Sequence, residues 1–164
     1  MRRTDREVAD TASILAILDR CEVMRIALCA DNMPYIVPLN FAYKAVGEDV
    51  FIYFHCAREG KKLDLIAKNN AVCFEADCSC KILEAESACH WSAEYESVIG
   101  EGEITIVDDE DHKVKALDIL MGRYGFIGTP RYLQQELDAV LVLMIHVSSM
   151  TGKRKIQANL RGGE

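Results

Sequence analysis

Short apolar runs separated by turn residues dominate the hydrophobic pattern of the chain. β-strands are predicted over residues 23–30, 35–43, 50–55, 71–76, 95–107 and 139–147. The last run, from Ala139 to Val147, is continuously apolar and is expected to be a fully buried strand. Asp31-Asn32 supplies turn chemistry between the first two strands and predicts a hairpin there. Residues 77–90 show no clear period and are interpreted as a loop or a weak strand.

Helical spacing appears in three segments that flank the strands. Residues 11–20 follow Asp10, a good N-cap, and residues 61–69 follow Gly60. Residues 108–124 begin with four acidic side chains, which suit the positive end of a helix, and Gly125 is expected to end that helix. Residues 132–137 are compatible with a further helical turn, and Asn69-Asn70 with a left-handed helix end. This order of elements favours a mostly antiparallel barrel with peripheral helices over a doubly wound sheet.

Two predicted strands contain residues that weaken a strand. Pro38 cannot donate to a β-ladder, so it indicates an edge strand, a bulge, or a place where the sheet faces something other than another strand. Gly100 and Gly102 indicate a bulge, a barrel corner or the close approach of a ligand.

The length and composition indicate one globular domain, residues 1–164. The chain has 164 residues, half of them hydrophobic, enough for one core. No run approaches the roughly 20 apolar residues of a membrane span, and the first residues lack a secretory signal, so a cytoplasmic protein without membrane contact is expected. The net charge of −7, without a long basic stripe, argues against nucleic-acid binding. Lys153-Arg154-Lys155 is interpreted as a solvated segment, with a second anion contact as the alternative.

The cysteine pattern favours reduced thiols and no metal. Seven cysteines is an odd number, and no export signal accompanies them. Cys78, Cys80 and Cys89-His90 form the cluster nearest to metal spacing, but it lacks a Cys-x-x-Cys pair. His146, inside the last apolar run, is interpreted as a hydrogen-bonded core residue, with a functional role as the alternative.

The stretch from Tyr53 to Ile66 has the features of a phosphate-binding site. An apolar strand passes His55 and reaches Gly60, Lys61 and Lys62 at the start of a helical pattern. Free N–H groups and the positive end of a helix attract an anion, glycine permits close backbone approach, and the lysines add charge. We expect a phosphorylated cofactor there, although each lysine alone would also suit an ordinary surface.

Three blocks of sequence together resemble a known family. They are Tyr35-Ile-Val-Pro-Leu-Asn-Phe41, then Tyr53-Phe-His-Cys-Ala followed by Gly60-Lys-Lys-Leu-Asp-Leu65, and Tyr95-Glu-Ser-Val-Ile-Gly-Glu-Gly102. With the opening Met1-Arg-Arg-Thr-Asp-Arg-Glu7, they resemble the nitroimidazole-resistance group of the pyridoxamine 5'-phosphate oxidase-like flavin-binding split barrels. The resemblance covers most of the chain. It implies a mostly β fold, the FMN-binding split barrel, which is an antiparallel Greek-key barrel with peripheral helices.

The resemblance also implies a site for FMN, with FAD as a possible substitute. The implied cofactor contacts are Val37, Pro38, Leu39 and Asn40 along the ring, Phe54 and His55 at the junction of ring and ribityl chain, Lys61 and Lys62 at the phosphate, and Ser97 and Val98 facing the flavin. His55 is the candidate catalytic residue, a proton donor near neutral pH. The alternative is a strand-end histidine exposed to water.

The family binds its flavin between two protomers, so the resemblance implies a homodimer with the flavin at the interface. Trp91 is expected to contribute there or to belong to the core. The function implied is an FMN-dependent reductase of small nitroaromatic, 5-nitroimidazole-like, or related electron-accepting compounds. The alternative is a non-catalytic flavin or haem module, in which His55, His90 or His146 would be the axial ligand. Oxidation of pyridoxamine phosphate is not expected, because the end of the chain, from Lys153, lacks the basic and aromatic signature of those oxidases.

Overall fold

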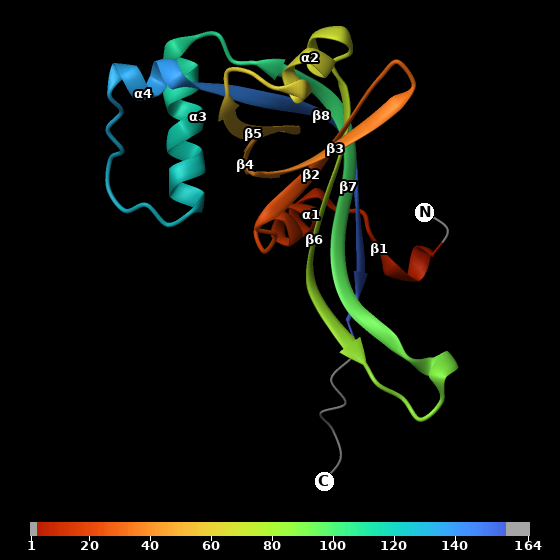
Figure 1. The fold of residues 1–164 in the computed structure, drawn as a ribbon. Coiled ribbons are helices and arrows are strands. Elements are labelled where there is room, and N and C mark those ends of the chain that lie inside the picture. Colours follow the sequence, from red (N-terminus) through yellow and green to blue (C-terminus); the bar gives the residue numbers. More distant parts are fainter. Residues whose placement is uncertain (1–2, 157–164) are drawn as a thin grey trace.

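The computed structural model describes residues 3–156, which form an eight-stranded antiparallel sheet surrounded by helices (Figure 1). Residues 1–2 and 157–164, the two ends of the predicted domain, lie outside the described residues. The strands are β1 (Glu7–Val8), β2 (Val23–Ala30), β3 (Met33–Asn40), β4 (Ala42–Val46), β5 (Asp49–Ala57), β6 (Ala71–Leu83), β7 (Ser92–Ile106) and β8 (Val140–Lys155). The helices are α1 (Thr11–Leu18), α2 (Lys61–Lys68), α3 (Glu110–Arg123) and α4 (Gln134–Ala139), with 3-10 turns at Thr4–Arg6 and Ala88–His90. None of the described helices is long and apolar enough to cross a membrane.

The strands follow the order β3-β2-β6-β7-β8-β5-β4, and β1 pairs with the second half of β8. β6, β7 and β8 lie side by side, and β5, which is connected to β6 through α2, pairs with the far side of β8. This arrangement is a Greek key. β3 and β4 end the path, so the ladder is open between them.

Two hydrophobic cores share the central strands. The main core fills the inside of the curved sheet, and the second lies between α3 and the outer face of β5 and β8. β5 contributes to both, because Ile52 and Phe54 face the main core and Tyr53 faces α3. Alternating strand residues point to opposite faces, so a strand covered on both sides shows the continuous apolar pattern seen in its sequence.

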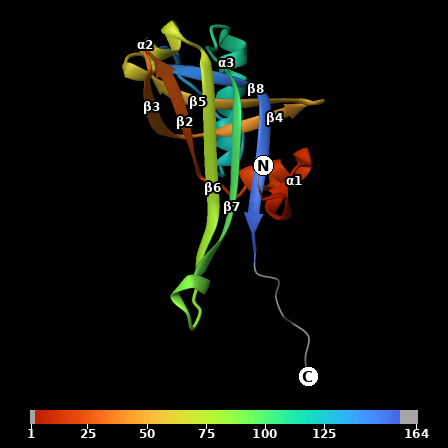
Figure 2. The same ribbon diagram turned by 90° about the vertical axis from the view of Figure 1, so that its right-hand side faces the viewer.

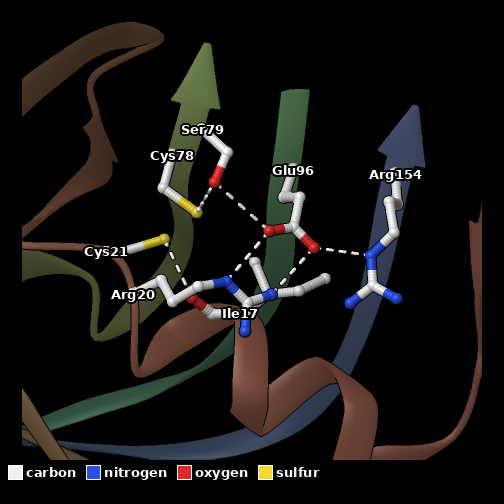
Figure 3. A network of polar contacts seen from close by, with 7 residues as sticks. All are labelled: Ile17, Arg20, Cys21, Cys78, Ser79, Glu96 and Arg154. Carbon is white, nitrogen blue, oxygen red and sulfur yellow. Dashed lines mark hydrogen bonds and ion pairs between the residues drawn. The ribbon is translucent and has the colours of Figure 1, made fainter. Parts of the chain in front are cut away.

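Helix α1 begins where the sequence predicts and is anchored to the sheet by an ionic network. The carboxylate of Asp10 accepts a hydrogen bond from the Ser13 N–H at 2.8 Å, the expected N-cap. Figure 3 shows that the network beyond the other end of α1 is centred on Glu96 of β7. Arg20 donates two hydrogen bonds to its carboxylate at 2.8 and 2.9 Å, and Arg154 of β8 donates a third. The Glu96 side chain is 4% exposed, so it is almost wholly buried by these partners.

Two strands extend well beyond their predicted ends. β6 continues as far as Leu83 through the segment interpreted as a loop or a weak strand, and its register shifts between Cys78 and Lys81. β8 continues through residues 148–155, beyond its predicted end at Val147, and pairs there with β7. The interpretation of residues 153–155 as a solvated segment is therefore wrong, because they belong to a paired strand.

Smaller corrections concern Asn69 and His146. Asn69 has an extended backbone, with φ −154°, and does not end α2 in the left-handed region. His146 is hydrogen bonded as predicted, with its Nε2 3.0 Å from Asp49 Oδ1, but its side chain is 54% exposed and outside both cores. It stacks on Phe51, with the ring centres 5.0 Å apart.

The strand glycines permit close packing and a bulge. A Cβ atom on Gly100 would lie 2.2 Å from Cζ of Phe74, and one on Gly102 would lie 2.3 Å from the His146 carbonyl oxygen. The β7–β8 register shifts between Glu101 and Gly102, so a bulge, one of the three predicted alternatives, is present there.

The far ends of β6 and β7 form a hairpin arm that projects beyond the barrel, as both ribbon views show (Figures 1 and 2). Trp91 lies on this arm, 52% exposed, and its indole N–H donates to the Ala85 carbonyl at 2.7 Å. Trp91 is therefore not a core residue.

Candidate functional site

The first turn of α2 has the free polar groups that an anion requires. Gly60 is its N-cap, with φ +138°, a conformation that side-chain-bearing residues rarely adopt, and it provides no side-chain cap. The Leu63 N–H bonds to the Gly60 carbonyl at 2.9 Å. The N–H groups of Lys61 and Lys62 precede any possible partner within the helix. The glycine, the free N–H groups and the two lysines predicted for a phosphate site therefore lie together at the first turn of α2.

The two lysines connect this turn to different strands. Lys61 lies over the ring of Tyr35 in β3, with Nζ 4.6 Å from the ring centre. Lys62 lies near Cys56 at the end of β5: burial raises the pKa of the Cys56 thiol, and the charge of Lys62 partly opposes this. Within the described residues, neither lysine forms a salt bridge with a carboxylate. Their charges remain available to an anionic ligand.

β3 is an edge strand in the described chain, and its predicted site residues alternate between two faces. Val37 and Leu39 pack against the main core, whereas Pro38 and Asn40 are exposed. Pro38 pairs with Arg25 of β2, the one strand to which β3 is hydrogen bonded within residues 3–156. An edge strand tolerates a proline, so this position alone accounts for Pro38 without a ligand.

Asn40 lies at a groove of about 1150 Å³ where β3 and β4 meet the ends of α1 and α3. Two residues at the end of α3 connect the segments that line this groove. Arg123 donates to the Leu18 carbonyl at 2.6 Å and lies 4.3 Å from the centre of the Phe41 ring. The Tyr124 hydroxyl accepts from the Phe41 N–H at 3.1 Å and donates to the Glu22 carbonyl at 2.9 Å. The groove is a preformed opening beside the last predicted residue of β3.

On β5 the two predicted residues point in opposite directions. The Phe54 side chain is fully buried in the main core, so only its main chain is available to a ligand. His55 is exposed. It lies on the same face of the sheet as Tyr53, and its partner in the neighbouring strand β8 is Val142. The structure gives His55 no polar partner within residues 3–156, so its ring can turn toward a bound molecule.

Ser97 and Val98 lie apart from the other predicted residues. Tyr35 shares a row across the sheet with Leu28, Val72 and Gly102. Ser97 precedes Gly102 by five residues in β7, roughly 16 Å at the usual strand rise. The side chain of Val98 is fully buried in the main core. Within a single chain, α2, β3 and the end of β5 therefore lie close together. Ser97 and Val98 of β7 lie away from them.

Several contacts at and near this site were not predicted. Tyr35 was noted only as part of a sequence block, and Arg123 and Tyr124 only as parts of a packing helix. The inward spacing of Tyr35, Val37 and Leu39 was an available signal for Tyr35. The contacts of Arg123 and Tyr124 join residues about a hundred positions apart, for which a single sequence offers no local signal. Among the described residues, no group of three or more His, Cys, Asp or Glu side chains could hold a metal ion.

The open antiparallel Greek-key sheet with peripheral helices defines the class of this protein as a split barrel, as predicted. A sequence profile described as Pyridoxamine 5'-phosphate oxidase matches residues 10–154, and the chain belongs to this family. No curated protein sequence matches the chain significantly.

Solved structures share the fold over nearly the whole chain. A candidate 5-nitroimidazole antibiotic resistance protein from Bacteroides thetaiotaomicron is 28% identical, with a TM-score of 0.78 over 90% of this chain and 86% of that one. The flavocytochrome Anf3 from Azotobacter vinelandii is 19% identical, with a TM-score of 0.79 over 99% of this chain and 75% of that one. A FAD and heme binding protein from Mycobacterium smegmatis is 21% identical, with a TM-score of 0.79 over 92% and 73%. The last two are similar in fold alone.

Proposed function

We propose that this protein binds FMN, or FAD in its place, and is a reductase of small nitroaromatic compounds of the 5-nitroimidazole kind. The observation that carries the proposal is the first turn of α2, where Gly60 leaves the helix end uncapped and two lysines lack carboxylate partners in the described chain. These features fit the phosphate of a flavin nucleotide. A bound flavin would supply the redox chemistry, and the protein would supply position and charge.

The remaining residues fit a flavin that extends from α2 along β3. The exposed edge of β3 at Val37, Pro38, Leu39 and Asn40 is open to a flat ring, and the groove at Asn40 leaves room for a small substrate beside it. His55, exposed at the end of β5, is the group that donates a proton as negative charge develops on the substrate. The nitroaromatic substrate is proposed from the likeness to the Bacteroides protein.

The proposed active form is a homodimer with the flavin at its interface. Ser97 and the backbone of Val98 cannot join the α2 end of their own chain, because roughly 16 Å of β7 separates them. A second copy, placed against the open edge of β3, would supply these residues. The projecting arm with the exposed Trp91 offers further surface for the same contact.

The visible spectrum of the purified protein tests the cofactor, and an anaerobic reaction tests the activity. We expect flavin absorption, with the flavin reduced chemically and then reoxidised by a 5-nitroimidazole in the absence of oxygen. A Soret band would instead support the haem alternative, with His55, His90 or His146 as the axial ligand. Flavin absorption without reoxidation would support a non-catalytic flavin module.

A further inference from the structure

Two thiols lie side by side where the segment after α1 meets β6. Cys21 follows α1 and is 1% exposed, whereas Cys78 is partly exposed and lies at the register shift of β6. Figure 3 shows their sulfur atoms facing each other. Cys21 belongs to the main core, and Cys78 packs against that core.

Polar groups surround the Cys78 sulfur on the side away from the core. The Ser79 hydroxyl, held by a backbone with φ +60°, lies 3.6 Å from the Cys78 sulfur and 3.3 Å from Glu96. The Arg20 guanidinium also interacts with Cys78. Burial lowers the pKa of Arg20, but the hydrogen bond and charge of Glu96 together with a smaller contribution from Cys78 raise it overall. A cation and a hydroxyl donor beside a partly exposed thiol are the features of a reactive cysteine.

Cys21 has the opposite surroundings. Its thiol is enclosed by the main core and donates to the Ile17 carbonyl at 3.3 Å. Burial, and next the negative charge of Cys78, raise the pKa of the Cys21 thiol to about 12. An oxidant in solution therefore meets Cys78 first, and Cys21 is placed to react with its product.

We propose that Cys21 and Cys78 form an oxidative modification site, a dithiol that hydroperoxides convert to a disulfide. In the first step the Cys78 sulfur attacks the peroxide, the O–O bond breaks, and sulfenic acid and water or an alcohol form. In the second step the Cys21 sulfur attacks the Cys78 sulfur, an S–S bond forms and the hydroxyl leaves as water. Two electrons pass from the pair of sulfurs to the peroxide, and a thiol reductant reverses the change.

This inference goes beyond the proposed function and does not depend on a flavin. The remaining thiols offer internal controls: Cys80 is two residues from Cys78 and more exposed, and Cys29 and Cys89 are exposed on other segments. If exposure alone decided reactivity, these three would be oxidised before Cys78.

The test is a peptide map of the full-length protein after treatment with equimolar hydrogen peroxide and alkylation of the remaining thiols. Trypsin places Cys21 in residues 21–25 and Cys78 in residues 69–81. We expect these two peptides joined, at their combined mass less two hydrogens plus the alkyl groups on Cys73 and Cys80, and separated by dithiothreitol. Fragmentation of the joined peptide assigns the bond to Cys78 rather than Cys73 or Cys80.

Three variants give independent readouts. Cys80→Ser should retain the joined peptide, and Cys78→Ser should lose it. In Cys21→Ser the sulfenic acid on Cys78 has no partner, so dimedone should label Cys78. If Cys21→Ser does not fold, the map of the unaltered protein still decides the question.

Three outcomes would overturn the proposal. One is a joined peptide that links Cys21 to Cys80. Another is oxidation confined to Cys29, Cys80 or Cys89 while residues 21–25 stay alkylated. The third is conversion of Cys78 to the sulfinic acid with no disulfide at any time.

Discussion

Lys61 Nζ lies 4.6 Å from the centre of the Tyr35 ring, which joins the first turn of α2 to the edge strand β3. A cation over an aromatic face keeps its charge, because the ring attracts the ammonium without neutralising it. An anion bound at this turn therefore meets a positive charge that is already positioned next to β3. The same contact connects the proposed phosphate end of the site with the strand proposed to follow the ring.

Replacing Lys61 and Lys62 together by Ala should weaken flavin binding more than about a hundredfold, because two charge-assisted contacts of roughly 1.5–3 kcal/mol each are removed. The protein should remain folded, since neither side chain belongs to a core. A fluorescence titration with FMN measures the affinity. Lys68→Ala, at the other end of the same helix, is the matched control and should bind FMN normally. Equal affinities in the two variants would show that the phosphate binds elsewhere.

His55→Ala should slow the anaerobic reoxidation of the reduced protein by a nitroimidazole about 10²–10⁴-fold and change flavin affinity much less. A residue that donates a proton only as charge develops acts on the transition state and not on cofactor binding. Stopped-flow absorbance measures the step. His146→Ala is the control, because His146 lies on the same face of the sheet but is held by Asp49. If both variants react at the unaltered rate, His55 is an ordinary exposed histidine.

Sedimentation equilibrium at micromolar concentration should give about twice the chain mass of 18.4 kDa. Because a cofactor shared by two protomers links binding to association, removing the flavin should weaken the dimer. The measurement is made with and without saturating FMN. A monomer that retains its flavin would contradict the shared site.

Glu96→Gln should lower the free energy of unfolding by about 1–3 kcal/mol, since charge-assisted hydrogen bonds from Arg20 and Arg154 are lost. Burial raises the pKa of Glu96, but the hydrogen bonds from both arginines outweigh it and the pKa in the folded chain is lowered. The carboxylate therefore stabilises the fold above its ordinary pKa of 4.5, and this stability is lost as the pH falls through the lower folded-state value. Urea unfolding at several pH values measures the effect.

The pH dependence of the stability distinguishes the contribution of Glu96 from that of exposed carboxylates. The difference between the unaltered protein and Glu96→Gln should shrink as the pH falls below the ordinary range of a carboxyl group. Glu86→Gln, in the exposed loop of the arm, should change neither the stability nor its pH dependence. A difference that stays constant down to acid pH would mean that the charge of Glu96 contributes nothing.

Gly100→Ala should destabilise the protein by about 1–3 kcal/mol, because the added methyl group would overlap the Phe74 ring and the Ser149 carbonyl. Gly122→Ala is the matched control: a Cβ there meets nothing within 4 Å, and alanine in a helix is favoured by roughly 0.5–1 kcal/mol. Thermal unfolding should therefore shift in opposite directions for the two variants. A neutral Gly100→Ala would show that Phe74 moves aside freely.

The sequence predicted those parts of the fold whose signal is local. Asp10 was recognised as the cap of α1, and Asp31 and Asn32 form the turn between β2 and β3 with φ of 55° and 59°. The extension of β6 was left open between a loop and a weak strand, and the extension of β8 was missed, because their residues are largely polar. Backbone pairing with β7 holds them in strands, and such pairing leaves no hydrophobic period in the sequence.

In the candidate site, too, the parts with a local sequence signal could be predicted and the others could not. Gly60, Lys61 and Lys62 are contiguous, so their meeting at a helix start could be predicted. The contact of Lys61 with Tyr35 and the groove walls formed by Arg123 and Tyr124 depend on how distant segments pack. The burial of Phe54 and Val98 shows the limit of transferring a motif, because a motif does not state which way each side chain points.

The position of β8 between β7 and β5 constrains the order in which the polypeptide can reach its final form. During synthesis β5 and β7 emerge well before β8, and until then the edges that will hold it are exposed. Such edges can pair with other chains, so this interval is when a growing chain is most prone to aggregate. Folding has to wait for contacts between residues about ninety positions apart, such as Phe51 with His146, which makes a slow, late closing step the expected kinetic signature.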